Sequence, residues 1–172
     1  MPAHDYHFEE QWFIPNHGPA RVYAVLSDAS ITPQWWRGVY LEATPLGPYR
    51  APVVGARVHA RARGYLPYTL EFTLEALDLQ PGRLVEVRAS GDFDGVWRAT
   101  LSAEDGGTRV EIDWQVRVDK PLIRWLSPLL KPLFAWNHNW TTPRGERGMI
   151  RYLDRQAQPQ TSAYESATWA MA

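Results

Sequence analysis

The chain has 172 residues, of which 45% are hydrophobic and 22% are charged, with a formal net charge of −1. This balance predicts a single globular domain and provides no field that would attract nucleic acid. The absence of cysteine excludes disulfides, thiolate catalysis and cysteine-ligated metals or clusters. The opening MPAHDYHFEEQ lacks the basic and apolar regions of a signal peptide, and no apolar run reaches the roughly 20 residues of a membrane span, so we expect a cytoplasmic protein.

The first predicted element is a half-buried strand over residues 4–14, where apolar and polar side chains alternate. One face carries aromatic and aliphatic side chains: Tyr6, Phe8, Trp12 and Ile14. Glu10 breaks the alternation, because its position puts a carboxyl group on this apolar face. Either Glu10 is buried as a candidate for proton transfer, or a bulge or edge position lets it reach water.

Two short helices are expected next. Pro19 suits the first position of a helix, and three aliphatic residues follow at helical spacing, which predicts a helix over residues 19–26. Residues 31–36 contain an early proline and two late tryptophans, a pattern that predicts a second helix of a single turn.

Six further strands are predicted, over residues 39–44, 57–63, 68–76, 83–90, 92–102 and 108–118. Turn sequences such as Gln80-Pro81-Gly82 and Ser90-Gly91-Asp92 join them, so they form an antiparallel meander. Strict alternation indicates a sheet with one apolar face and one solvated face. We expect the arginines and glutamates of the later strands on the solvated face.

The apolar face needs a cover, and the sequence after residue 120 is the segment long enough to provide it. Residues 133–156 are predicted to be a long helix that Pro143 and Gly145 kink or interrupt. Residues 157–172 are rich in Gln, Ser and Ala, which predicts a disordered tail after one domain formed by residues 1–156.

Local motifs carry a resemblance to a known family. Ile14-Pro15, Val22, Val25-Leu26 and Pro33-Gln34-Trp35-Trp36 sit where the polyketide cyclase/dehydrase family of the START-like, or SRPBCC, superfamily has its strand–helix–helix opening. GDFDGVWRATL and GGTRVEIDWQV resemble the last two strands of that family. Asn16-His17-Gly18 departs from the family's usual small or proline-rich turn. The resemblance covers roughly residues 6–155.

The resemblance implies an α+β helix-grip fold, in which a curved antiparallel sheet of about seven strands encloses a long C-terminal helix. Members of the superfamily bind lipids, sterols, quinones and polyketides, and some catalyse cyclisation or dehydration. The residues expected to line a cavity between sheet and helix are Trp12, Trp35, Trp36, Tyr68, Phe72, Trp97, Trp114, Phe134, Asn137, His138 and Thr141. A solid aromatic core without a cavity is the structural alternative.

Three functions are consistent with the sequence. The first is binding of a small hydrophobic or aromatic ligand, such as a lipid, quinone or polyketide-like molecule. The second is an enzyme of the cyclase or dehydratase type, in which Glu10 or His138 transfers a proton. The third is a peripheral lipid or quinone carrier that docks on a membrane through residues 120–136, a segment that is also a candidate lid or homodimer contact.

We expect no cofactor and no metal. The five histidines, His4, His7, His17, His59 and His138, show no ligand spacing with carboxylates. Nucleotide-binding glycine motifs and nucleophile elbows are also absent from the sequence.

Overall fold

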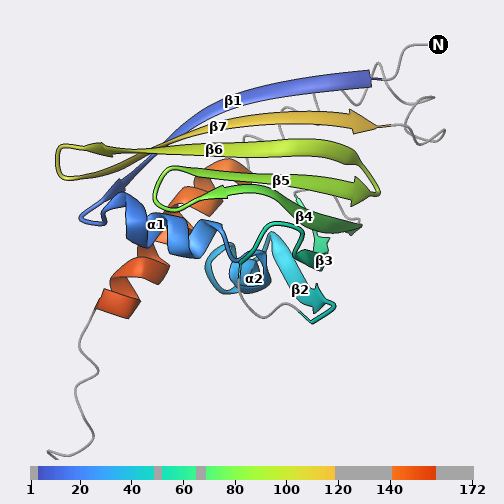
Figure 1. The fold of residues 1–172 in the computed structure, drawn as a ribbon, viewed down its shortest axis with the longest axis horizontal. Coiled ribbons are helices and arrows are strands. Elements are labelled where there is room, and N and C mark those ends of the chain that lie inside the picture. The colour runs from blue at the N-terminus through green and yellow to red at the C-terminus, as the bar shows by residue number, and fades with distance from the viewer. Residues whose placement is uncertain (1–3, 49–51, 65–68, 119–140, 158–172) are drawn as a thin grey trace, which may run out of the picture.

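A computed structural model describes residues 4–48, 52–64, 69–118 and 141–157 (Figure 1). The strands are β1 (His4–Pro15), β2 (Tyr40–Leu46), β3 (Arg57–Ala62), β4 (Leu70–Gln80), β5 (Leu84–Gly91), β6 (Asp94–Glu104) and β7 (Gly107–Val118). The helices are α1 (Pro19–Leu26), the 3-10 helix η1 (Ala29–Ile31), α2 (Thr32–Trp35) and a C-terminal helix formed by residues 141–157.

The seven strands form one antiparallel sheet in the order β1-β7-β6-β5-β4-β3-β2. Six strands follow one another as a meander, and β1 joins its far edge by pairing with β7. The sheet is curved, and α1, α2 and the C-terminal helix lie on the same side of it (Figure 1). This is the predicted α+β helix-grip architecture.

The core lies between the sheet and these helices. Alternate residues of the strands are buried there, as the period-two pattern requires. The main cluster of buried hydrophobic residues combines strand residues with residues of the helices: Trp12, Ile14, Val22, Val25, Leu26, Trp35, Val85, Ala99, Leu101, Val110, Ile112, Met149 and Leu153. The solvated face carries the predicted charged side chains, including the Arg98–Glu86 pair.

The register of β1 on β7 is continuous from His4↔Val118 to Pro15↔Gly107. Glu10 pairs opposite Ile112 in this unbroken ladder, so the bulge considered for Glu10 is wrong. Its side chain therefore points to the same face as its alternate neighbours along the strand, which is the face that the helices cover. The edge position is confirmed, because β1 is the outermost strand of the sheet and Glu10 is only half-buried.

Most observed bounds lie within two residues of the predicted ones, and the larger differences are at three places. A 3-10 turn precedes α2, because the Asp28 carboxylate accepts the Ser30 N–H at 3.0 Å and starts the helical turn early. Strand β4 continues to Gln80, beyond the predicted end at residue 76. A β-bulge between Ala76 and Asp78 shifts the alternation by one residue, so that Leu79 packs against the core after it.

The third difference concerns the C-terminal helix. Residues 141–157 are helical throughout, so the expected interruption at Pro143 and Gly145 is wrong, while the alternative of a kink there stays a prediction. Gly145 is buried, and a Cβ atom there would lie 2.8 Å from Trp36 Cε2 and 3.0 Å from Trp12 Cη2. Close packing against two indole rings therefore offsets the low helix propensity of glycine. The part of the predicted helix before residue 141 lies outside the described residues.

Candidate functional site

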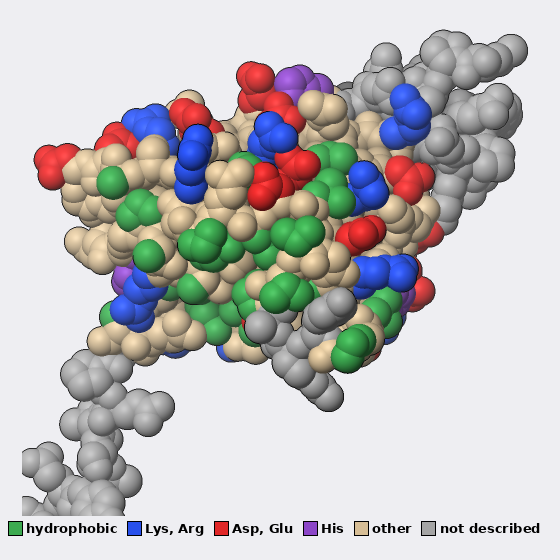
Figure 2. All heavy atoms as spheres, viewed as in Figure 1, with side chains coloured by type: hydrophobic (Ala, Val, Ile, Leu, Met, Phe, Trp, Pro, Cys, Tyr) green, Lys and Arg blue, Asp and Glu red, His purple; other side chains and the backbone are tan. Residues whose placement is uncertain are grey.

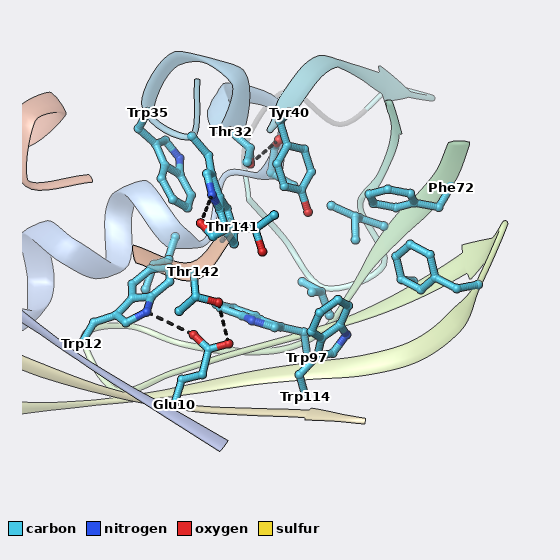
Figure 3. Close-up of a pocket in the computed structure, with 17 residues that line it drawn as sticks. Glu10, Trp12, Thr32, Trp35, Tyr40, Phe72, Trp97, Trp114, Thr141 and Thr142 are labelled. Atoms are coloured by element: carbon cyan, nitrogen blue, oxygen red, sulfur yellow. Dashed lines mark hydrogen bonds between the residues drawn. The ribbon is translucent and has the colours of Figure 1, made fainter. Parts of the chain in front are cut away.

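A cavity of about 100 Å³ lies between the inner face of the sheet and the helices (Figure 3). Its described lining is mainly aromatic and aliphatic, with one carboxyl group and a few hydroxyl groups. The lining residues are Glu10, Trp12, Leu26, Ala29, Thr32, Trp35, Trp36, Tyr40, Phe72, Leu74, Val87, Ala89, Phe93, Trp97, Trp114, Thr141 and Thr142. Within this described lining there is no Lys, Arg or His.

Aromatic rings surround the cavity in a continuous series, which we call the aromatic arc. Its members, in spatial order, are Trp12, Trp36, Tyr40, Phe72, Phe93 and Trp114, and neighbouring ring centroids lie 4.8 to 6.0 Å apart. These distances are typical of favourable aromatic pairs. The arc starts on β1, passes through the segment after α2, strands β2 and β4 and the turn before β6, and ends on β7.

The side chain of Glu10 lies between the two ends of the aromatic arc. Figure 3 shows its carboxylate directed into the cavity, with Trp12 on one side and Trp97 and Trp114 on the other. Thr142 Oγ1 donates a hydrogen bond to Glu10 Oε1 at 2.9 Å, and Trp12 Nε1 donates to Glu10 Oε2 at 3.3 Å. The two donors fix the carboxylate at a defined position, as a proton-transfer or ligand-orienting group requires.

The C-terminal helix closes the cavity through its first described residues. Thr141 and Thr142 contribute to the lining, and the Thr141 carbonyl accepts a hydrogen bond from Trp36 Nε1 at 3.0 Å. Further along, Gly145 and Gly148 allow the helix to approach α2 closely, because side chains at these positions would overlap Trp36 and the Trp35 carbonyl oxygen. The C-terminal helix therefore packs directly against Trp35 and Trp36.

Tyr40 brings a phenol group into the cavity from β2 (Figure 3). Burial raises the pKa of the Tyr40 hydroxyl well above its ordinary value of 10, because the phenolate would lose its hydration. The Tyr40 hydroxyl is therefore neutral at physiological pH. It provides a hydrogen-bonding group for a ligand, and no negative charge.

The structure brings most of the candidate residues to this one cavity. The predicted residues that line it are Trp12, Trp35, Trp36, Phe72, Trp97, Trp114 and Thr141, together with Glu10. The remaining candidates, Tyr68, Phe134, Asn137 and His138, lie outside the described residues, as do residues 120–136. That any of these side chains contacts a ligand stays a prediction.

Tyr40, Phe93 and Thr142 also line the cavity but were not among the candidate ligand residues. Phe93 has the inward parity of Trp97, so alternation could have identified it. The local sequence does not identify Thr142 as a cavity residue, because its role depends on a hydrogen bond to Glu10, 132 positions earlier.

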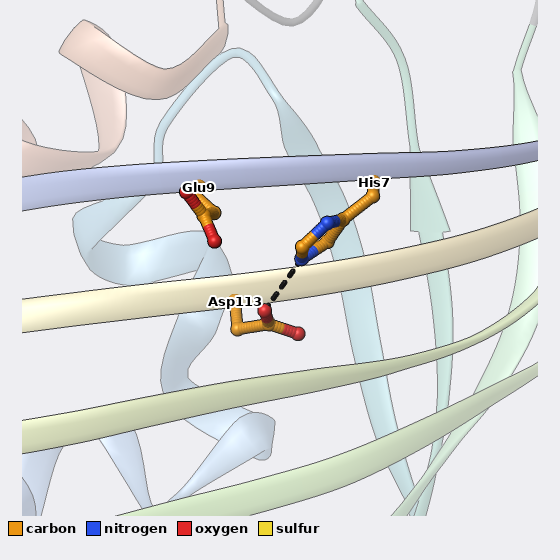
Figure 4. Close-up of side chains that lie close together, drawn as sticks. All are labelled: His7, Glu9 and Asp113. Carbon is orange, nitrogen blue, oxygen red and sulfur yellow. Dashed lines mark hydrogen bonds and ion pairs between the residues drawn. The ribbon is translucent and has the colours of Figure 1, made fainter.

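A second group of polar side chains lies on the solvated face, across β1 and β7 (Figure 4). Ligand atoms of His7, Glu9 and Asp113 lie within 4.8 Å of one another. His7 Nε2 and Asp113 Oδ2 are hydrogen-bonded, and this bond raises the pKa of His7 and lowers that of Asp113. Sequence spacing missed this group, because Asp113 comes from the paired strand. The side chains of His7 and Asp113 are both well exposed, and each is a hydrogen-bond partner of the other. The expectation that the protein binds no metal stays a prediction.

The charged side chains on the face seen in Figure 2 are of mixed sign. Acidic and basic side chains are interspersed on the face seen in Figure 2, without an extended region of one sign. Several form cross-strand or near-neighbour pairs, such as Arg61–Glu42 and Arg109–Glu104. Exposed pairs of this kind contribute little to stability, and the pattern gives no reason to place a site there.

The sequence matches the model of a protein family described as "Polyketide cyclase / dehydrase and lipid transport" over residues 7–139. No match to a curated protein sequence was found. No helix in the described part of the chain is long and apolar enough to span a bilayer.

Solved structures share the fold. The Zhui aromatase/cyclase from Streptomyces sp. R1128 superposes with a TM-score of 0.72 at 11% identity, covering 92% of this chain and 99% of its own. TTHA0849 from Thermus thermophilus has a TM-score of 0.71 at 14% identity, with 90% and 100% covered. Norcoclaurine synthase from Thalictrum flavum, solved with dopamine and hydroxybenzaldehyde, has a TM-score of 0.60 at 11% identity, with 91% of both chains covered. At these identities the likeness establishes the fold alone.

Proposed function

Because the chain belongs to the polyketide cyclase/dehydrase and lipid transport family, we propose that its cavity binds a small hydrophobic or aromatic molecule. The observation that carries this proposal is the aromatic arc around a space of about 100 Å³. Ligand sites are typically apolar clefts with a few well-placed polar groups. The hydroxyl of Tyr40 and the carboxylate of Glu10 are such groups here.

The size of the cavity indicates what part of a ligand it holds. An engineered cavity of roughly 150 Å³ in another protein binds benzene, so the space described here matches a single ring. A longer lipid, quinone or polyketide chain would extend beyond the described lining. Affinity would come from the apolar surface that the ligand buries, at roughly 25 cal/mol per Å² before the costs of association.

Native mass spectrometry of the purified protein, with organic extraction of any bound molecule, tests this proposal. We expect a mass above that of the polypeptide, and an apolar or aromatic compound in the extract. A matched pair of variants locates the site. Ala89→Leu puts a larger side chain into the cavity and should abolish binding, whereas Ala103→Leu makes the same change at an exposed position of β6 and should retain it. Equal retention by both folded variants would contradict the proposed site.

A second candidate function is catalysis of cyclisation or dehydration, favoured by the position of Glu10. A carboxylate that faces an apolar cavity and is held by two hydrogen bonds can accept a proton from a bound substrate. The same arrangement is expected to hold a reactive chain in a folded shape, which lowers the entropic cost of ring closure. The other candidate for proton transfer, His138, lies outside the described residues.

Turnover of a polyketide-like substrate by Glu10→Gln distinguishes the two functions. If the protein is an enzyme of this type, the variant should lose turnover and still bind the substrate. Glu9→Gln is the matched control, because Glu9 precedes Glu10 in β1 and points to the solvated face. Turnover that survives in Glu10→Gln would exclude Glu10 as the proton acceptor.

A further inference from the structure

We infer that the cavity recognises a carbonyl oxygen on its ligand, with the Tyr40 hydroxyl as the group that donates a hydrogen bond to that oxygen. This inference rests on the proposed binding function and narrows its ligand class to molecules that carry such an acceptor. A ketone or a quinone meets the requirement, whereas a hydrocarbon chain alone does not. The placement of Tyr40 by a β-bulge, its packing between two rings and the state of its hydroxyl support the inference.

A β-bulge accompanies the inward orientation of Tyr40 at the start of β2. Tyr40 pairs opposite Ala62, and Glu42 pairs opposite the next residue of β3, Arg61, so Leu41 is the extra residue. Ala62 is buried on the inner face of the sheet, and Tyr40 shares that face, whereas Leu41 is exposed. Bulges commonly re-aim a side chain beside a functional site. The small side chain of Ala62 leaves room for the phenol ring.

Two neighbouring rings hold the phenol ring of Tyr40 in place. Its centroid lies 5.4 Å from that of Trp36 and 6.0 Å from that of Phe72, and the rings of Tyr40 and Phe72 meet edge to face at 80°. The backbone N–H of Tyr40 also donates to the Trp36 carbonyl at 3.1 Å. Figure 3 shows the hydroxyl directed into the cavity. The position of the hydroxyl is therefore set before a ligand arrives, which lowers the cost of binding.

No residue that the structure describes is a hydrogen-bond partner of the Tyr40 hydroxyl, and burial alone raises its pKa. Buried tyrosine hydroxyls usually find a partner. The indole N–H groups of Trp12 and Trp36, by contrast, donate to acceptors of the protein. The indole N–H of Trp35 also lacks a described acceptor, but its nitrogen atom is fully buried. Within the described wall, the Tyr40 hydroxyl is therefore a free donor that a ligand can reach.

A free donor in an apolar space favours a ligand that brings an acceptor. Because its pKa is raised, the Tyr40 hydroxyl keeps its proton at neutral pH and remains a donor. A carbonyl group gives up its hydration when it enters an apolar cavity, and a hydrogen bond from Tyr40 offsets that loss. A ligand without an acceptor displaces solvent from the hydroxyl and replaces no hydrogen bond. The hydroxyl therefore shifts the preference of the cavity toward ligands with a carbonyl oxygen.

A purely space-filling role for Tyr40 makes a different prediction. In that case the ring completes the aromatic arc, and the hydroxyl contributes nothing to recognition. Tyr40→Phe would then change the affinities for all ligands alike. The donor role instead predicts an effect confined to ligands that carry an acceptor.

Isothermal titration calorimetry with acetophenone and α-methylstyrene tests the inference at neutral pH, because the two molecules share their shape and differ in a C=O against a C=CH2 group. Tyr40→Phe keeps the ring and removes the hydroxyl. It should weaken acetophenone binding about tenfold, which corresponds to roughly 1.4 kcal/mol, and leave the affinity for α-methylstyrene unchanged. Tyr152→Phe is the matched control, since the Tyr152 hydroxyl donates to Gln34 outside the described lining, and both affinities should stay unchanged.

Carbon-13 NMR of acetophenone labelled at its carbonyl carbon reads the hydrogen bond directly. Hydrogen bonding moves this resonance downfield, so the bound ligand should resonate downfield of its position in cyclohexane. In Tyr40→Phe the resonance should return toward that position. A bound resonance at the cyclohexane position in the unchanged protein would overturn the inference, even if Tyr40→Phe does not fold.

The outcomes separate the inference from the function on which it rests. Equal losses of affinity for both ligands in folded Tyr40→Phe, or no loss for either, would overturn the role of the hydroxyl and leave the proposed binding function intact. Failure of both ligands to bind the unchanged protein, with no molecule extracted from it as purified, would overturn the proposed function and the inference together.

Discussion

Replacing Gly148 by alanine should destabilise the protein, although the same change stabilises most helices. Gly148 is buried in the C-terminal helix, directly against α2. A Cβ atom at this position would overlap the backbone carbonyl oxygen of Trp35. A backbone atom cannot rotate away as the end of a side chain can, so either the helix or α2 has to move.

The expected magnitude is the difference between two opposing effects. Alanine is better than glycine in a helix by about 1 kcal/mol, whereas inserting a group into a packed core typically costs about 1 to 3 kcal/mol or more. Because the overlap in this case is with backbone, we place the cost at the upper end of that range. The net loss is then about 1 to 2 kcal/mol, equivalent to a decrease in Tm of about 2 to 8 °C for a chain of this length.

Differential scanning calorimetry of the protein and Gly148→Ala measures this decrease. Arg151 provides an internal control, because it is exposed in the same helix. At that position Arg151→Ala should be more stable than Arg151→Gly by the ordinary helix propensity, so the order of alanine and glycine should be opposite at the two sites. If Gly148→Ala raises Tm as alanine does at position 151, the contact between the helix and α2 is not as close as described.

Three further predictions concern the cavity and the titrating groups. In Gly145→Ala, the new Cβ atom would lie 2.8 to 3.0 Å from the rings of Trp36 and Trp12, so these rings must shift. Isothermal titration calorimetry should then show weaker binding of a single-ring ligand such as benzyl alcohol, and an unchanged affinity would contradict this. Because hydrogen bonding to Asp113 raises the pKa of His7, its contribution to stability is present below about pH 6.5 and is lost as pH rises through the raised pKa. The Tm difference between the protein and His7→Gln should therefore shrink from about pH 5.5 to about pH 8.5, and a constant difference would refute the assignment. Burial raises the pKa of the Tyr40 hydroxyl, so the folded state keeps this proton at a pH where the unfolded state loses it, and stability decreases above about pH 10. The decrease in Tm above about pH 10 should therefore be smaller for Tyr40→Phe than for the unchanged protein. An equal decrease in both proteins would show that Tyr40 is not its cause.

Much of the fold follows from local patterns in the sequence. In β3 and β7 the alternation of side chains identifies the buried face, because consecutive residues of a strand point to opposite sides. The same logic marks Glu10 as an exception, since its parity places a carboxyl group among aromatic residues. The continuous pairing of β1 with β7 shows that this exception does not result from a bulge.

What the sequence leaves open depends on contacts between distant segments. The hydrogen bond from Thr142 to Glu10 joins residues 132 positions apart, and no periodicity encodes such a pair. The unbroken helix around Gly145 has the same origin, because its packing against tryptophans from other elements outweighs local propensity. The composition of a cavity wall can be predicted by parity, whereas its closure and its hydrogen bonds cannot.

The pairing of the first strand with the last has a consequence for the order in which the protein can form. β1 is synthesised first, but it acquires its hydrogen-bonding partner only when β7 is complete, and Glu10 acquires Thr142 later still. Until then, Trp12 and Ile14 belong to an unpaired edge. Joining segments roughly 100 residues apart carries a loop-closure cost that local turns avoid, so such pairings form slowly. The meander β2–β6 can assemble as it emerges from the ribosome, whereas the cavity can be completed only after β1 and residues 141–157 have been synthesised and have packed against it.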